Sequence, residues 1–437
     1  IGASGDTVTL ASGASQSGFG RTGTVDWQTG SIKTATFTAA NGEGYFCDTS
    51  SSAFTVNLPA GSAGAIVSVA DYTRTFNSNN LTVSPNGSEK IGGIAGNTKL
   101  TVNGQAATFV YVDGTEGWIN VQETQTSTTG TTGFIMATGG TETTCGNCKI
   151  HTFTGPGTFC VAHIADCAAN NVVSHVIVAG GGGGGGDVGG GGGAGGYREV
   201  KTPVTPYTAS PKDGYPSAPN RITVTATAFP ITVGSGGSGG IYDGGSSSRG
   251  NDGNTSTFST ITSAGGGGGG SHPQSCAASG NPGGSGGGGG ARSGASGGSG
   301  NVPPVSPPQG NNAGNAAPSP TPSLIDAGAG GGGATAASSN ASNCTATAGG
   351  AGATSCITGS PVARSGGGGG GIDPGGGGSS GAAGGSGGGG AGGPKGNVGV
   401  AGTANTGGGG GGSSKGTPGT NGGAGGSGVV IIRYKFQ

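Results

Sequence analysis

Long tracts of glycine are the feature that most limits what this chain can fold into. The chain has 113 glycines among its 437 residues, and most of them lie after residue 170. Collagen is equally rich in glycine but repeats it strictly at every third residue, whereas here the glycines come in blocks. The main tracts are Gly180–Gly186, Gly189–Gly196 (broken only by Ala194), Gly265–Gly270, Gly286–Gly290, Gly366–Gly371 and Gly407–Gly412.

A polyglycine tract can be ordered only by its own backbone. Glycine loses more conformational entropy on folding than any other residue, and it has no side chain to bury. An extended threefold helix with polyproline-II geometry makes no internal hydrogen bonds, so its amides and carbonyls are free to bond neighbouring helices. A six-residue tract would form a rod of about 19 Å. We therefore predict a bundle of polyglycine-II rods joined by loops, with irregular β structure and partial disorder as the alternatives.

Composition excludes several classes of protein. Charged residues make up 8% of the chain and its net charge is −1, so there is no basic footprint for nucleic acid. No stretch approaches 18 apolar residues, which argues against a membrane span. The chain starts with Ile1 rather than Met, so we expect a processed or partial chain. Thr, Ser and Val are common while strong helix formers are scarce, which predicts almost no α-helix.

The order of segments predicts all-β modules around the glycine tracts. Residues 1–122 are predicted to form a β-rich module, with a hairpin at Asp113-Gly114. We expect Trp27 and Trp118 to be core or seam residues rather than ligand platforms. Residues 123–149 form a polar linker with a Cys-x-x-Cys segment. Residues 150–437 form the glycine-rich domain. The domain's expected strands are 172–178 paired with 429–434, and 222–227 paired with 231–233.

Eight cysteines require an explanation. Cys47 lies in a strand-like run, where a buried thiol behaves as a small hydrophobic group. Disulfides suit a loop-rich extracellular chain with little core. Free thiols and a zinc site are the alternatives, the latter because Cys-x-x-Cys followed by two more cysteines is a known zinc spacing. The disulfide candidates are Cys145, Cys148, Cys160, Cys167, Cys276, Cys344 and Cys356.

Motifs for catalysis or cofactor binding are weak. There is no Gly-Lys-Ser/Thr phosphate loop, and Gly-x-Gly-x-x-Gly carries no weight where glycine repeats. Gly-Gly-x-Gly-x-Asp ends at Asp187 and at Asp373, but calcium-binding β-rolls need this unit in tandem. His175 lies in an apolar strand and is interpreted as a satisfied core residue. We predict no catalytic residues, no metal and no cofactor.

Recognition residues are expected in the loops between tracts, because bare backbone offers little chemistry of its own. For each candidate the alternative is that its side chain merely packs against a rod. The aromatic, charged and apolar candidates are Tyr242, Asp243, Arg249, Phe258, His272, Arg292 and Ile372.

The ordered motifs of residues 150–437 resemble the glycine-rich domain of bacteriophage tail fibres. These motifs are Thr-Phe-Thr, Gly-Thr-Phe, Val-Ile-Val-Ala followed by glycines, Gly-Gly-Tyr-Arg-Glu and a closing Val-Val-Ile-Ile-Arg-Tyr. The amino-terminal module, with Gly-Glu-Gly-Tyr-Phe-Cys-Asp-Thr, is similar to modules in tail-fibre-like proteins of marine phages. A related class of phage adhesins packs polyglycine-II rods and binds host receptors through loops at the tip of the bundle.

This resemblance implies a function outside the cell. It implies a receptor-binding part of a virion tail fibre, commonly a homotrimer, that attaches to a host polysaccharide or outer-membrane protein. It brings no fixed catalytic motif, so we do not expect an enzyme, and the 18 acidic residues show no clustering in sequence that would suggest a hydrolase. A cellular surface or matrix fibre and an ice-binding protein are the alternatives. A regular Thr or Ala face would favour ice binding, whereas aromatic loops at one end favour adhesion.

Overall fold

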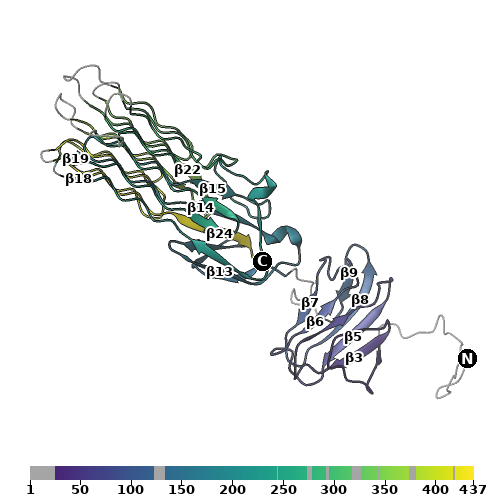
Figure 1. Ribbon diagram of the computed structural model, residues 1–437. Coiled ribbons are helices and arrows are strands. Elements are labelled where there is room, and N and C mark those ends of the chain that lie inside the picture. Colours follow the sequence, from purple (N-terminus) through teal and green to yellow (C-terminus); the bar gives the residue numbers. More distant parts are fainter. Residues whose placement is uncertain are drawn as a thin grey trace, which may run out of the picture. The chain divides into compact units, whose positions relative to one another are not determined.

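A computed structural model describes residues 25–122, 133–243, 245–272, 278–291, 295–316, 326–342, 345–373, 380–416 and 419–437. The chain divides into two compact units, unit 1 (Ile1–Gly133) and unit 2 (Phe134–Gln437) (Figure 1). The described residues contain many short strands and no α-helix, which confirms the expected scarcity of helix. The helical elements among them are two 3-10 turns, η2 (Ala168–Asn171) and η3 (Ala218–Asn220). None of the described segments is a helix long and apolar enough to cross a bilayer.

Unit 1 consists of two sheets whose inner faces share one hydrophobic core. The five-stranded sheet has the order β1 (Asp26–Trp27), β3 (Glu43–Cys47), β5 (Ile66–Asp71), β8 (Ala106–Asp113) and β9 (Gly117–Asn120). The four-stranded sheet has the order β2 (Phe37–Thr38), β4 (Phe54–Asn57), β6 (Leu81–Ser84) and β7 (Thr98–Leu100). Alternating apolar residues of both sheets point inward, as expected for strands with one buried face.

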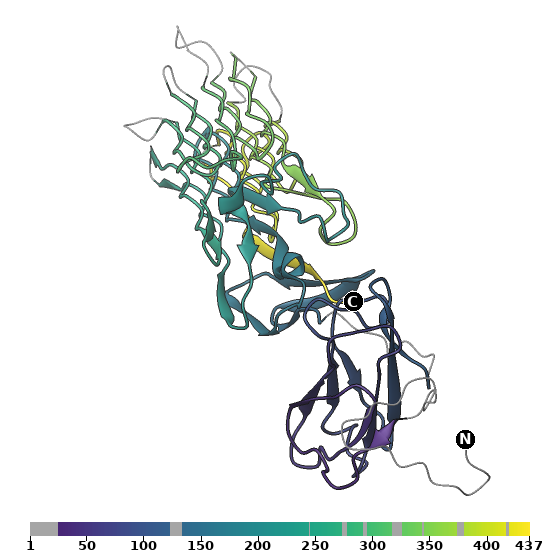
Figure 2. The same ribbon diagram turned by 90° about the vertical axis from the view of Figure 1, so that its right-hand side faces the viewer.

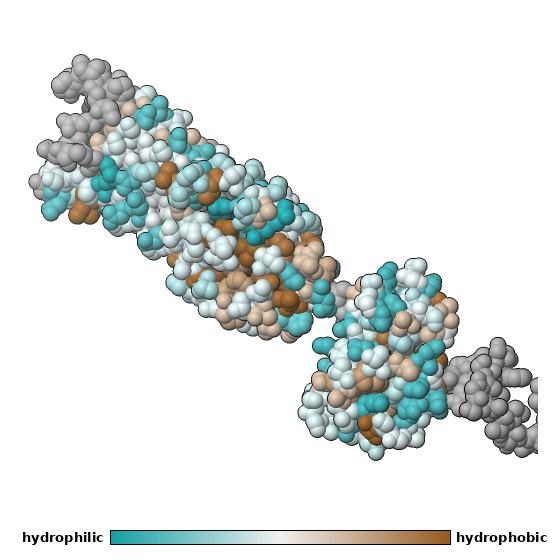
Figure 3. All heavy atoms as spheres, turned by 45° about the vertical axis from the view of Figure 1, so that its right-hand side comes forward, coloured by the Kyte–Doolittle hydropathy of each residue, from teal (hydrophilic) through white to brown (hydrophobic). Residues whose placement is uncertain are grey.

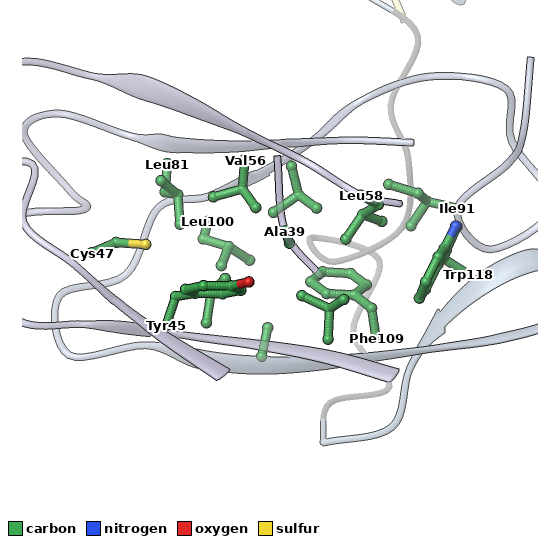
Figure 4. Close-up of a cluster of buried hydrophobic side chains, with 14 of the residues drawn as sticks. Ala39, Tyr45, Cys47, Val56, Leu58, Leu81, Ile91, Leu100, Phe109 and Trp118 are labelled. Carbon is green, nitrogen blue, oxygen red and sulfur yellow. The ribbon is translucent and has the colours of Figure 1, made fainter. Parts of the chain in front are cut away.

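Of the two tryptophans of unit 1, one lies in its hydrophobic core (Figure 4). Trp118 is fully buried beside Phe109 and Ile91, and its Nε1 donates to Glu89 Oε2 at 3.0 Å. Trp27 is 37% exposed, so it does not lie in the core, which was one of the two positions expected for it. Its strand, β1, has only two residues and pairs on one side only, which leaves the ring outside the core. Cys47 is buried as expected, and burial raises the pKa of its thiol to about 12.

The hairpin predicted at Asp113-Gly114 joins β8 to β9, but its turn is longer than two residues. Asp113 pairs with Gly117, and a register shift lies between Tyr111 and Asp113. The Asp113 carboxylate accepts the backbone amides of Thr115 and Glu116, each at 2.8 Å. This side-chain-to-backbone turn explains why Asp suits the position.

Two sheets lie at one end of unit 2, next to the glycine region. The first has the order β11 (Thr141–Cys145), β12 (Cys148–Phe153), β24 (Val429–Lys435), β14 (Val172–Val178) and β15 (Tyr197–Val200), with β16 (Ile222–Thr223) also on β14. The second has the order β10 (Met136–Thr138), β13 (Gly157–His163), β17 (Ala228–Thr232), β20 (Ser256–Phe258) and β21 (Ile261–Ser263). Two small hairpins are formed by β18 (Tyr242–Asp243) with β19 (Ser246–Ser247) and by β22 (Ala353–Ser355) with β23 (Val362–Arg364).

The antiparallel pairing of β14 with β24 brings the two borders of the glycine region together. The expected pairing of 222–227 with 231–233 is wrong, because β16 pairs with β14 while β17 pairs with β13 and β20. Apolar residues of both sheets form a core that includes Phe159, Ile177 and Tyr434. Figure 3 shows apolar surface gathered over this end of unit 2, which we call the sheet end, whereas the glycine region is mostly pale.

The glycine tracts run side by side as extended segments, here called rods (Figure 2). The rod 180–186 donates its amides with a period of three residues. The amides of Gly180 and Gly183 donate to Asn254 and Asn251, which belong to one rod. The residue after each of these two glycines donates to the rod at 423–426, and the residue after that donates to the rod at 190–193. Its carbonyls accept amides from three further rods, at 237–240, 266–269 and 410–413. Every side of this central rod is therefore hydrogen-bonded to another rod.

The rods can lie this close to one another because glycine has no side chain. A Cβ added to Gly181, Gly184 or Gly191 would lie only 2.0–2.1 Å from a backbone carbonyl oxygen of another rod, which is far inside van der Waals contact. Outer rods carry side chains at one or two positions of three and keep glycine where they face another rod. In 248–254, for example, Gly250 and Gly253 approach the central rod while Asn251 and Asp252 are exposed.

The cysteines that the structure describes are free thiols, so the predicted disulfides are absent among them. The fold gives these side chains different surroundings. Cys148 is buried, Cys145 packs beside Gly359, and Cys160 and Cys167 are exposed. The free thiols are Cys47, Cys145, Cys148, Cys160, Cys167 and Cys356, whereas Cys276 and Cys344 lie outside the described residues. No group of three or more His, Cys, Asp or Glu side chains suited to a metal occurs in the described ranges.

Candidate functional site

Charged and aromatic side chains meet at the end of the rod bundle opposite the sheets, which we call the tip. Figure 1 shows the β18–β19 hairpin there, far from β13 and β24. The chain reverses at the tip after the first rod, where Asp187 (φ 45°) and Val188 (φ 53°) adopt left-handed backbone conformations. The reversal returns the chain antiparallel, so that the Gly185 amide donates to the Gly190 carbonyl at 2.9 Å.

His272 joins two of the tip connections. Its Nδ1 lies 3.7 Å from Asp187 Oδ2, and its Nε2 lies 3.3 Å from Asp326 Oδ2. Its backbone amide also donates to the Asp187 carbonyl at 3.1 Å. The imidazole is about one-third exposed, so solvent reaches it. Two carboxylates, those of Asp187 and Asp326, therefore face one imidazole at the tip.

Lys415 and Asp373 form a second charged pair at the tip. Lys415 Nζ lies 2.8 Å from Asp373 Oδ2, and this hydrogen bond is the main reason why the pKa of Lys415 is raised. The Asp373 amide donates to the Asp326 carbonyl at 2.9 Å, which links the pair to the His272 cluster. Burial raises the pKa of Asp187, although His272 and Lys415 oppose that shift.

The β18–β19 hairpin packs on the same group of connections. The Tyr242 amide donates to Asn421 Oδ1 at 2.8 Å, and its ring lies against Gly419. The Ser247 hydroxyl donates to the His272 carbonyl. Asp243 is exposed beside Tyr242, and Ile241 is 57% exposed. The tip thus offers an aromatic ring, carboxylates, an ammonium group and an imidazole within a small area.

The structure separates the predicted recognition residues into groups. Tyr242, Asp243 and His272 lie at the tip. Ile372 also lies there, but it is only 4% exposed and bridges to Ala327. Arg292 lies outside the described residues.

Two of the predicted residues do not fit an exposed loop. Arg249 lies along the side of the bundle, where its guanidinium donates to Asn281 Oδ1 at 2.5 Å. Phe258 is fully buried at the sheet end, packed edge-on against Phe159 and Phe229, so its predicted contact with a receptor is wrong. The reason is that β20 pairs with both β17 and β21 and turns its aromatic residue into the core.

Sequence reasoning missed the three aspartates and the lysine of the tip. Asp187 and Asp373 each follow a glycine tract, and this was the available signal, since a charged residue ending a rod must lie at a bundle end. Residues 187, 326 and 373 are distant in sequence, and the lateral order of the rods brings them together.

A protein-family model described as a glycine-rich domain matches residues 154–435, which is well over half of the chain. The chain belongs to this glycine-rich domain family. The match covers the rods, both bordering strands β14 and β24, and all of the tip residues named above. Unit 1 lies outside the match. A search of curated proteins found no significant match to the chain.

Proposed function

We propose that this protein is the receptor-binding distal part of a viral tail fibre, of the bacteriophage type, that attaches to a host surface. In this proposal the glycine-rich domain is a stiff rod bundle, and its tip contacts a cell-surface polysaccharide or outer-membrane protein. The single observation that carries it is the concentration of Tyr242, Asp243, His272 and Lys415 at one end of a bundle whose interior is made of backbone. Binding residues commonly lie on loops held by a rigid scaffold.

We infer that the rods have polyglycine-II geometry. The support is the three-residue period of the amide donors along 180–186, since a threefold helix turns each third residue in the same direction. The carbonyls follow the same period, with Gly266 and Gly269 donating to Gly180 and Gly183. Such a bundle would hold the tip loops in fixed positions without a large hydrophobic core.

The aromatic and charged tip supports adhesion over the passive matrix fibre. It also supports adhesion over ice binding, because the tip chemistry is varied rather than regular. In keeping with a fibre, we propose that the protein acts outside the cell on the virion, as a homotrimer, without catalysis or a cofactor. Carboxylates and an ammonium group can exchange hydrogen bonds with sugar hydroxyls or with polar protein side chains.

Adsorption to cells tests the proposal. Labelled full chain is incubated with a panel of bacterial cells, and bound protein is measured for the wild type, a Tyr242→Ala/Asp243→Ala variant and a Glu142→Ala control. Glu142 is a partly exposed residue of β11 at the sheet end, away from the tip. Point variants are preferable to deleting residues 242–258, because that stretch includes the rod 248–254 and β20.

The expected result is saturable binding to some strains that falls at least tenfold in the tip variant and is unchanged in the control. Equal loss in both variants would point to a fold defect or to binding at the sheet end. Saturable binding that neither variant changes would refute the tip as the contact surface. Absence of saturable binding to every strain would count against the adhesin proposal itself.

A further inference from the structure

The turn of the β11–β12 hairpin brings two cysteines opposite each other. β11 ends at Cys145 and β12 begins at Cys148, and the two residues pair directly in register. The turn between them consists of Gly146 and Asn147, and Gly146 has a left-handed backbone (φ 56°), as two-residue hairpin turns that start with glycine require. The strand pairing therefore fixes which two thiols face each other.

Both side chains project from the same face of the sheet. Directly opposed residues of an antiparallel pair point to the same side. Cys145 packs against a hydrophobic cluster that includes Ile150, which lies two residues after Cys148 in β12 and therefore shares its face. Cys148 is 1% exposed, whereas Cys145 is half-buried. Solvent thus reaches one thiol of the pair, and the other is covered.

The spacing of opposed residues in a hairpin suits a disulfide bond. Opposed Cα atoms in antiparallel strands lie about 4.5–5.5 Å apart, within the range of about 4.4–6.8 Å that disulfides span. Opposed Cβ atoms lie about 4.5–5.5 Å apart and disulfides need about 3.5–4.5 Å, so the two strands must close by about 1 Å. β11 can make this adjustment because it is an edge strand, which pairs with β12 alone among the described strands.

The other cysteines in the described part of the chain lack a cysteine opposite them. Cys160 pairs in register with Thr138 and Ala228, and Cys47 pairs with Asp71. The described cysteines that lie outside strands are Cys167 and Cys356.

We propose that Cys145 and Cys148 are a dithiol pair that a small-molecule disulfide, such as glutathione disulfide, oxidises to an intramolecular disulfide. The Cys145 sulfur attacks first because it is the reachable one, and it forms a mixed disulfide and releases one glutathione. The Cys148 sulfur then attacks the Cys145 sulfur and releases the second glutathione. The pair loses two electrons to glutathione disulfide, and its two thiol protons end on the two released glutathiones. This inference does not depend on the proposed receptor function.

Oxidation of the pair would hold the turn of the hairpin against β24. The Asn147 carbonyl in the turn accepts the Phe436 amide at 3.0 Å, and Cys148 pairs with Lys435 at the end of β24. β24 also pairs with β14, which leads into the first rod. The disulfide would therefore fasten the outer edge of the sheet that joins the two borders of the glycine region.

The free thiols of the full chain are mapped to test the proposal. Reduced protein is incubated with glutathione disulfide, denatured in N-ethylmaleimide and digested, and each cysteine peptide is identified by mass spectrometry. We expect the peptide with residues 145–148 to lack two hydrogen atoms and to carry no alkyl group. Exposed Cys160 should instead carry glutathione or the alkyl group. In a Cys148→Ser variant, shown to be folded by circular dichroism, Cys145 should keep one glutathione.

Three results would overturn the proposal. The first is a wild type in which Cys145 and Cys148 are both alkylated although Cys160 has taken up glutathione, which shows that the reagent was active. The second is a stable glutathione adduct on Cys145 of the wild type beside an alkylated Cys148. The third is a bond from Cys145 to Cys356, whose turn reaches Cys145 at Gly359. Cell adsorption is measured separately, so its failure would contradict the receptor proposal and leave the thiol pair standing.

Discussion

A Cβ atom built on Gly191 would lie 2.1 Å from the carbonyl oxygen of Gly368 in a neighbouring rod. The two residues are far apart in sequence, yet the rods that hold them are bonded through Gly368 N–H and the Gly192 carbonyl at 2.8 Å. Because the obstructing atom belongs to a backbone that is itself bonded to other rods, it has little room to move. The glycine-rich domain therefore depends on missing side chains as much as an ordinary core depends on present ones.

Gly191→Ala is expected to destabilise unit 2 by about 3 kcal/mol or more, since overpacking a close-packed region typically costs 1–3 kcal/mol and here the backbone must shift. Gly155→Ala is the matched control, because nothing lies within 4 Å of a Cβ at that position. Urea unfolding followed by circular dichroism measures both variants, and the control should stay within about 0.5 kcal/mol of the wild type. Equal stability of the two variants would contradict the close approach of the rods.

The stability of unit 2 should depend on pH through the buried side chain of His175. This residue lies in the core as the sequence predicted, but its Nδ1 is buried without a hydrogen-bond partner in the described structure, so it is not satisfied. Burial, assisted by the positive charge of Arg198, lowers the pKa of His175 to about 3 from 6.5. Below pH 6.5 the unfolded chain binds a proton that the folded chain does not, so stability falls by roughly 1.4 kcal/mol per pH unit toward pH 3.

The variant His175→Leu should lose less stability than the wild type as the pH falls, because a leucine at this position cannot take up a proton on unfolding. Stability is measured by urea unfolding at pH 7 and pH 4 for both proteins. Burial also lowers the pKa of His151, so some acid sensitivity should remain. A variant that loses as much stability as the wild type between the two pH values would rule out His175 as the group responsible.

Asp187 should change the stability of unit 2 with pH in the direction opposite to that of His175. Burial raises the pKa of its carboxyl above the unfolded value, so its favourable contribution is present below the unfolded pKa and is lost as the pH rises through the folded value. Asp187→Asn should therefore leave stability at pH 7 unchanged or raise it by up to about 1 kcal/mol, with no gain at pH 3. Asparagine tolerates the left-handed backbone at this position, so the turn is kept. Thermal unfolding at the two pH values would count against this account if the variant were less stable only at pH 7.

The sequence predicted individual elements better than their arrangement. The runs Val172–Val178 and Val429–Lys435 are apolar and β-branched, which is enough to indicate strands that pair in a buried sheet. Phe258 was misplaced because a three-residue strand flanked by Ser and Thr looks like a loop until its two partner strands are known. The tip cluster could not be predicted, because tracts of identical glycines contain nothing that specifies which rod lies beside which. The rods that place Asp187, Asp326 and Asp373 together are ordered instead by the side chains of the connections and sheets.

Glu199 joins three parts of the sheet end, so its removal should be costly. It is 2% exposed, and its carboxylate accepts hydrogen bonds from the Tyr197 hydroxyl at 3.0 Å, the Ser210 amide at 2.9 Å and the Ser355 hydroxyl at 2.6 Å. Glu199→Ala would leave these buried donors without an acceptor and the buried Arg364 without a nearby negative charge. We expect a loss of about 3–5 kcal/mol in the free energy of unfolding of unit 2, as for one partner removed from a buried charged network.

Glu199→Gln, which keeps one acceptor and the shape, should lose less, and the surface variant Glu142→Ala should change stability by less than about 1 kcal/mol. If Glu199→Ala were no more damaging than Glu142→Ala in urea unfolding, the carboxylate would not be what holds β15, the segment around Ser210 and β22 together.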